Sequence, residues 1–74
     1  MENNASRLLN ATRLKLASEY HEALANLQVF LSNPSGVADH PDITGQITEF
    51  IRKASGAKDA LALLDSLEIQ SEND

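Results

Sequence analysis

Cysteine and tryptophan are absent from this 74-residue chain, and Tyr20, Phe30 and Phe50 are its only Phe, Tyr or Trp residues. The lack of cysteine excludes disulfide bonds and thiolate metal sites. Without disulfides, a chain this short rarely buries enough apolar surface to be stable alone, and oligomerisation is a common remedy. Hydrophobic residues nevertheless make up 42% of the chain, which is typical of a globular protein and not of a disordered one.

A long hydrophobic run is also missing. The longest uninterrupted run, Ala60 to Leu64, has five residues, whereas a membrane-spanning helix needs about 20. The polar segment at residues 1–7 has no basic region followed by an apolar stretch, so we expect no secretory signal. These absences predict a cytoplasmic protein that makes no contact with membranes.

Clustered positive charge is the third absence. The net charge of −5 arises entirely from residues 38–74, because basic and acidic residues balance over 1–37. Arg52 and Lys53 are the only adjacent basic residues. Binding to phosphates depends on clustered Lys and Arg, so we expect neither nucleic acid nor an anionic membrane surface as a partner. A basic protein partner fits this charge better.

Apolar residues at spacings of three, four and seven predict a helix over 4–32. No proline or glycine lies between Met1 and Asn33, and Pro34 is expected to end the helix near Ser32. The apolar stripe is wide, which is typical of a bundle helix and not of a narrow coiled-coil seam. It contains Leu9, Leu16, Tyr20, Ala23, Leu27 and Phe30, with Ala17, Leu24 and Leu31 beside them.

A second helix is predicted over 41–69, after a loop at 33–40 and before a frayed acidic tail at 70–74. Asp39 or His40 is the expected N-cap, with Pro41 in the first turn and Asp42 near the positive end of the helix dipole. Thr44 is an alternative cap. The stripe of this helix contains Ile43, Ile47, Phe50, Ala54, Ala57, Leu61 and Leu64, flanked by Ile51, Ala60 and Leu67.

The pair Ser55-Gly56 allows two interpretations. Glycine inside a helix costs about 1 kcal/mol relative to alanine, so the helix could break there and leave a short third helix over 57–68. The apolar stripe, however, passes through Gly56 without a change of phase. We therefore favour a continuous helix.

An antiparallel alignment of the two helices supports this choice. Since both helices rise equally per residue, facing positions are expected to have numbers that add up to about 74. Ala23 then faces Phe50, and Tyr20 faces Ala54, so that large residues meet small ones. The same alignment places Arg13 close to Asp65 and Glu68, with which it can form an ion pair.

The expected fold is therefore all-α: one antiparallel helical-hairpin domain over residues 1–74. A single partner helix leaves the flanks of each stripe exposed, and large exposed apolar patches usually mark an interface. The simplest closure is a homodimer that forms a four-helix bundle; a higher oligomer and a three-helix monomer broken at Gly56 are the alternatives. The expected core and oligomer-interface residues are Leu16, Tyr20, Leu24, Leu27, Phe30, Leu31, Ile43, Ile47, Phe50, Ile51, Leu61 and Leu64.

The segment Asp39-His40-Pro41-Asp42 is the main candidate for chemistry. Its two carboxylates and imidazole can bind a divalent cation, and His40 can carry protons. Helix capping explains both acids without a metal. A metal or ligand site at Asp39, His40 and Asp42 is therefore kept only as a remote alternative.

Other candidate motifs lack the spacing that their chemistry requires. In Glu19-Tyr20-His21-Glu22 no second histidine follows His21 by four residues, and Ser18 stands where a Glu-x-x-His di-iron motif needs glutamate. The pairs Ser35-Gly36 and Ser55-Gly56 do not belong to phosphate-binding loops, because neither lies in the Gly-rich sequence that such a loop requires. We expect no catalytic residue, no metal and no cofactor, and so no enzyme.

One short segment resembles a known group of proteins. The sequence Asn33-Pro34-Ser35-Gly36-Val37, followed by Asp39-His40-Pro41-Asp42-Ile43, looks like a loop found in small uncharacterised helical-hairpin proteins of tailed bacteriophages, especially marine ones. The likeness covers about a dozen residues, the loop and the two helix ends. It implies a helical hairpin of viral origin and implies no activity.

These observations predict a small structural or protein-interaction module that acts as a helical homo-oligomer, its main partner being a second copy of itself. The phage resemblance implies an accessory factor in the host cytoplasm that binds another protein. The alternative function is that of an acidic protein that masks a basic nucleic-acid-binding partner.

Overall fold

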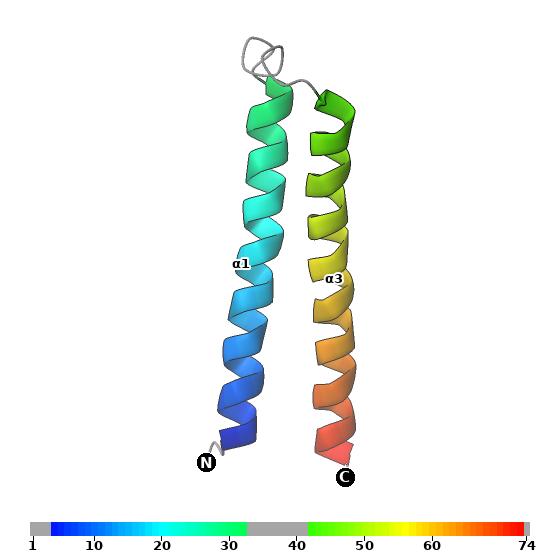
Figure 1. Ribbon diagram of the computed structural model, residues 1–74. Coiled ribbons are helices and arrows are strands. Elements are labelled where there is room, and N and C mark those ends of the chain that lie inside the picture. Colours follow the sequence, from blue (N-terminus) through cyan, green and yellow to red (C-terminus); the bar gives the residue numbers. More distant parts are fainter. Residues whose placement is uncertain (1–3, 33–41, 74) are drawn as a thin grey trace.

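The computed structural model describes residues 4–32 and 42–73, with side chains up to residue 68. Helix α1 (Asn4–Ser32) and helix α3 (Ile43–Asn73) lie side by side and antiparallel, with the N- and C-terminal ends of the pair at the same end (Figure 1). The predicted all-α hairpin is confirmed. The molecule is a rod of 53 × 17 × 15 Å.

Helix α3 begins two residues later than predicted, and Asp42 is its N-cap. The Asp42 carboxylate accepts a hydrogen bond from the backbone N–H of Gly45 at 3.0 Å. The Asp42 carbonyl accepts the first helical hydrogen bond, from the N–H of Gln46, at 3.1 Å. Asp42 rather than Asp39, His40 or Thr44 therefore caps the helix, because its carboxylate reaches the N–H three residues on. Asp39, His40 and Pro41 lie outside the described residues.

Gly45 belongs to the same capping arrangement. A Cβ atom at this position would collide with the carboxylate of Asp42. Glycine therefore leaves room for the capping side chain in a turn where alanine would otherwise be the better helix former.

Gly56 does not interrupt α3, which confirms the interpretation as one continuous helix. The helix also runs on to Asn73 instead of ending at Ile69, so the predicted tail at 70–74 is wrong for residues 70–73. No glycine or proline follows Gly56 in the sequence. The acidic residues oppose the helix dipole at this end, but no residue in this stretch forces a helix to stop.

The core between the helices is small. The buried hydrophobic residues among those described are Ala23, Ala54, Ala57 and Leu64, and three of these four are alanines. Small side chains let the two helices lie close together, and the larger stripe residues surround this line only partly buried.

The aromatic contact shows how side-chain direction modifies the predicted alignment. The rings of Phe30 and Phe50 meet edge to face, with centroids 6.0 Å apart, although Phe50 was expected opposite Ala23. Helical side chains tilt toward the N-terminus of their own helix. In an antiparallel pair the two rings therefore tilt toward each other along the rod, and residues in contact have numbers that add up to more than the backbone alignment predicts.

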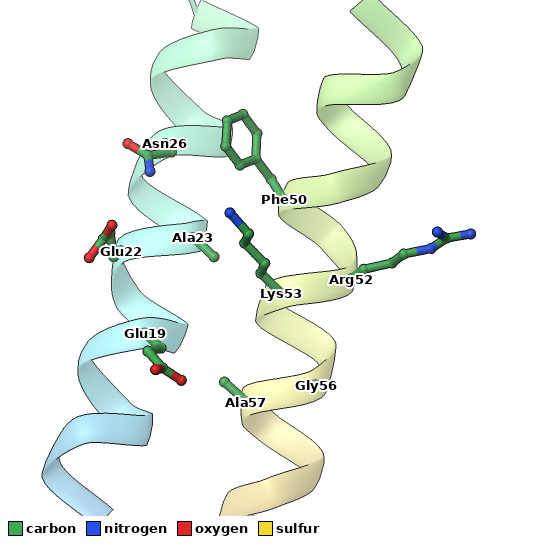
Figure 2. A pocket seen from close by; sticks show the side chains of 9 residues that line it. All are labelled: Glu19, Glu22, Ala23, Asn26, Phe50, Arg52, Lys53, Gly56 and Ala57. Carbon is green, nitrogen blue, oxygen red and sulfur yellow. The ribbon is translucent and has the colours of Figure 1, made fainter.

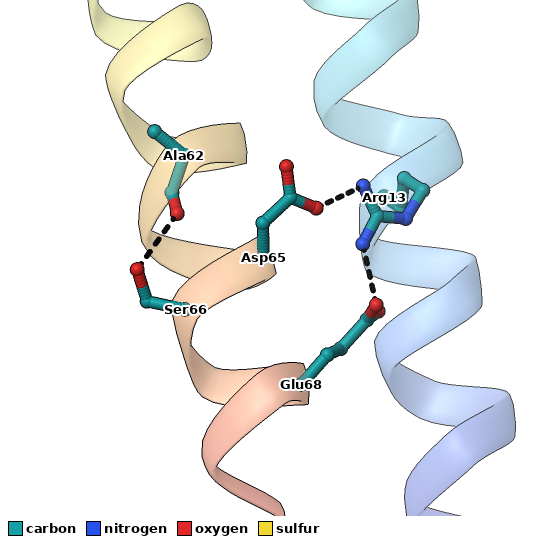
Figure 3. A network of polar contacts seen from close by, with 5 residues as sticks. All are labelled: Arg13, Ala62, Asp65, Ser66 and Glu68. Carbon is teal, nitrogen blue, oxygen red and sulfur yellow. Dashed lines mark hydrogen bonds and ion pairs between the residues drawn. The ribbon is translucent and has the colours of Figure 1, made fainter. Parts of the chain in front are cut away.

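Arg13 connects the helices near the end that carries both termini. Its two terminal guanidinium nitrogens, Nη1 and Nη2, lie 2.7 Å from the Asp65 carboxylate and 2.7 Å from the Glu68 carboxylate, respectively (Figure 3). The predicted pairing is thus confirmed, and it involves both acids at once. The hydrogen bonds that Arg13 donates to Glu68 and, next in effect, to Asp65 raise the pKa of Arg13 above its ordinary value, so the guanidinium stays charged throughout the neutral range.

We expect Asp42→Ala to lower the free energy of unfolding by about 1 kcal/mol, the usual loss for a helix N-cap. Urea unfolding followed by circular dichroism measures the change. Asp42→Asn is the control, since an asparagine cap retains the acceptor oxygen.

We expect Gly45→Ala to bring no gain in the free energy of unfolding of the native chain. The same change should stabilise the Asp42→Ala variant, where no carboxylate is displaced. Additive effects of the two changes would contradict the proposed coupling.

We expect Arg13→Gln to lower the Tm at low salt, and we expect the difference from the native chain to shrink as salt is added, because exposed ion pairs are screened. Lys15→Gln is the matched control: it removes the same charge two residues away, and Lys15 forms no ion pair within the described part of the chain. Equal melting curves for the two variants at low salt would show that the Arg13 contacts are absent in solution.

Candidate interaction surface

The predicted interface residues divide into a covered and an open set. Leu64 is buried at 5% exposure, whereas Leu31 and Ile51 remain 59% and 51% exposed and Ile43 36%. The other eight are half-buried between the helices: Leu16, Tyr20, Leu24, Leu27, Phe30, Ile47, Phe50 and Leu61. The hairpin thus brings the stripes together along one line and leaves their flanks in water.

Five more large apolar side chains are exposed that the predicted interface did not include. Leu8, Leu14, Val29 and Leu63 are each more than 60% exposed, and Leu67 is 47% exposed. Leu14 and Val29 lie out of phase with the stripe, and isolated exposed apolar residues of this kind are common. The exposure of Leu8 could have been predicted from the sequence. Leu8 lies seven and fourteen residues before the charged Lys15 and Glu22, and this spacing places it on the same side of α1 as these two residues.

The total exposed surface is large for a chain of this size. A compact monomer of 8.0 kDa is expected to expose about 4,450 Å². The hairpin exposes 5776 Å², so the excess is about 1,300 Å². The rod shape contributes to this excess, because two helices side by side hide only the strip along which they touch.

A shallow groove of about 460 Å³ lies on one broad face of the hairpin (Figure 2). Ala23 of α1 and Ala57 of α3 both point into the gap between the helices, at different heights along the rod. Gly56 lines the α3 side, and apart from its chain neighbours and the nearby backbone of its own helix, no atom lies within 4 Å of the place where a Cβ would stand. The full lining is Glu19, Glu22, Ala23, Asn26, Phe50, Arg52, Lys53, Gly56 and Ala57.

The two sides of this groove differ in charge. Glu19 and Glu22 stand on the α1 side, and neither forms an ion pair with any described residue. On the α3 side the Lys53 side chain extends toward the gap, whereas Arg52 points away from α1 (Figure 2). Lys53 lies 3.2 Å from Glu49 in an exposed pair, which uses one of the three ammonium donors. The groove therefore has an acidic wall and a basic wall.

The candidates for chemistry receive no support from the geometry. Asp42 is engaged as a helix cap. His21 lies exposed beside Tyr20, with ring centroids 5.3 Å apart. No three His, Asp or Glu side chains within 4–32 and 42–68 gather as a metal site would require. The remaining members of the Asp39-His40 candidate fall outside the described residues.

Neither described helix is apolar over enough of its length to cross a membrane. Comparison with family models finds no match, and neither the curated proteins nor the solved structures provide one. The inference of function therefore depends on the surface of the hairpin itself.

Proposed function

We propose that this chain is a structural or protein-interaction module that works as a homodimer, in which two hairpins form a four-helix bundle. The observation that carries the proposal is the excess exposed surface of about 1,300 Å² over that of a compact monomer. A standard protein interface buries about 800 Å² on each partner, so a second hairpin is large enough to cover most of the excess.

The kind of residue left in water supports the same proposal. Leu8 and Leu67 lie beside the helical stripes and stay 68% and 47% exposed. In a bundle each helix has two neighbours instead of one, so flanking positions become covered. The hairpin alone has only four buried hydrophobic residues among those described, which is a small core for a chain without disulfides.

The resemblance of the loop to phage proteins supports a narrower proposal. In this proposal the dimer is a viral accessory factor that acts in the host cytoplasm by binding a host or viral protein.

The alternative function, that of an acidic protein that masks a basic partner, has weaker support, since Asp65 and Glu68 are already engaged by Arg13. A complex that dissociates as salt is added would favour the masking protein, and one insensitive to salt would favour an apolar interface.

Light scattering combined with size exclusion tests the dimer. We expect a mass of twice 8.0 kDa at micromolar concentration and a Tm that rises with protein concentration, because association stabilises the folded state. A mass of one chain at every concentration, with full helicity, would refute the proposal.

We expect Ile47→Asp to abolish the dimer or to unfold the chain, because it places an unpaired charge between the helices. Leu14→Asp is the matched control: Leu14 is 65% exposed and lies away from the stripe, so the same charge should leave both helicity and mass unchanged. Circular dichroism and light scattering on the two variants measure these outcomes. Similar losses in both variants would mean that the charge itself, and not its position, destabilises the protein.

A further inference from the structure

We propose that the second copy docks on the grooved face of the hairpin, with the loop ends of both copies at the same end of the bundle. In this arrangement α1 of each copy lies over α3 of the other. The inference rests on the proposed dimer and adds which face is covered and in which orientation. The grooved face is defined by Glu19, Glu22, Lys53 and Gly56, which line the groove.

Sequence spacing extends the grooved face along the rod. Leu8, Lys15 and Glu22 are seven residues apart, and so are Lys53, Ala60 and Leu67. Residues at this spacing share one side of a helix. Leu8 and Leu67, which are 68% and 47% exposed, therefore continue the grooved face toward the end with the termini. An apolar pair at that end and a charged groove nearer the loop can both contact a helix laid along the face.

Gly56 is the first reason to place the partner here. No described glycine has a positive φ, and apart from its chain neighbours and the nearby backbone of its own helix, no atom lies within 4 Å of a Cβ built at Gly56. Neither backbone conformation nor packing within the hairpin thus requires glycine at a position where it costs about 1 kcal/mol. A helix of a second copy that approaches closely at this point would require it, because a missing side chain lets two backbones come together.

Charge determines the orientation. Glu22 and Lys53 line the same groove, so they lie at about the same height along the rod. With both loop ends together, Glu22 of one copy lies over Lys53 of its partner, and the two-fold axis repeats the pair. With the loop ends opposed, α1 would lie on α1 and would bring the Glu19 and Glu22 side chains of the two copies together, where like charges repel.

The opposite face is the rival position for the partner. Leu24 and Ile51 are each two residues from a residue of the grooved face, which is about 200° around a helix. With Leu31 they form an apolar flank on that side, and Leu31 and Ile51 are more than half exposed. The neighbouring residues Ser55 and Gly56 separate the two possibilities, since Ser55 is four residues from Ile51 and Gly56 lines the groove.

The first experiment compares Gly56→Gln with Ser55→Gln by sedimentation equilibrium. Glutamine is a better helix former than glycine, so both hairpins should fold, and circular dichroism verifies this. We expect Gly56→Gln to raise the dimer Kd at least about tenfold through overlap with the partner helix, and Ser55→Gln to change it by less than about threefold. The reverse result would place the partner on the Ile51 face, and equal Kd values for the two variants would also overturn the inference.

The second experiment tests the orientation with Glu22→Lys and Lys53→Glu. Each variant alone replaces two symmetric attractions by repulsions, and we expect the Kd to rise about tenfold. An equimolar mixture should form a heterodimer at least as tight as the native dimer, because every Glu22–Lys53 pair is then again of opposite charge. Lys58→Glu, on the side of Ile51, is the control and should dimerise like the native chain.

The outcomes separate this inference from the proposed function. A native chain that stays monomeric refutes both. A native dimer that both Glu22→Lys and Lys53→Glu leave intact overturns the proposed orientation. A dimer that is weakened by each charge change and restored in the mixture supports it.

Discussion

Each helix of this hairpin has a single neighbour, and that geometric limit governs the rest of the structure. Two helices side by side hide only the strip along which they touch, however apolar their other sides are. Here the strip is occupied by Ala23, Ala54, Ala57 and Leu64. Alanines allow a close approach but bury little area apiece. The strip between the helices therefore buries little apolar area, and the flanks of the stripes stay exposed in the hairpin.

Polar contacts at the two ends of the rod complement this narrow core. At the loop end, the Asp42 carboxylate caps α3, and Gly45 leaves the space for it. At the other end, Arg13 reaches across to Asp65 and Glu68. These groups lie near the surface, so each adds little to the free energy of unfolding. Their main effect is to define where α3 begins and how the two helices align.

The amount of this architecture that could be predicted from sequence differs from feature to feature. The periodic apolar stripes were sufficient to predict the hairpin, and their unbroken phase through Gly56 indicated that the second helix is continuous. Asp42 was not identified as the cap, because Asp39 and Thr44 are also N-cap residue types and only the backbone geometry selects among them. The contact of Phe30 with Phe50 was missed since an alignment of backbones ignores the tilt of side chains. The groove could not have been predicted, because it depends on which side chains lean away from the gap.

Arg13 has one further consequence. The chain joins its helices covalently at only one end, and helices with a seven-residue apolar period can slide past each other by whole turns with little change in apolar contact. A guanidinium that binds two acids three residues apart fits one alignment only, because a slide of one turn would carry it about 5.4 Å away from both. Arg13 thus provides a second, noncovalent link between the helices at the open end of the hairpin. It selects one alignment among several that the apolar residues would accept.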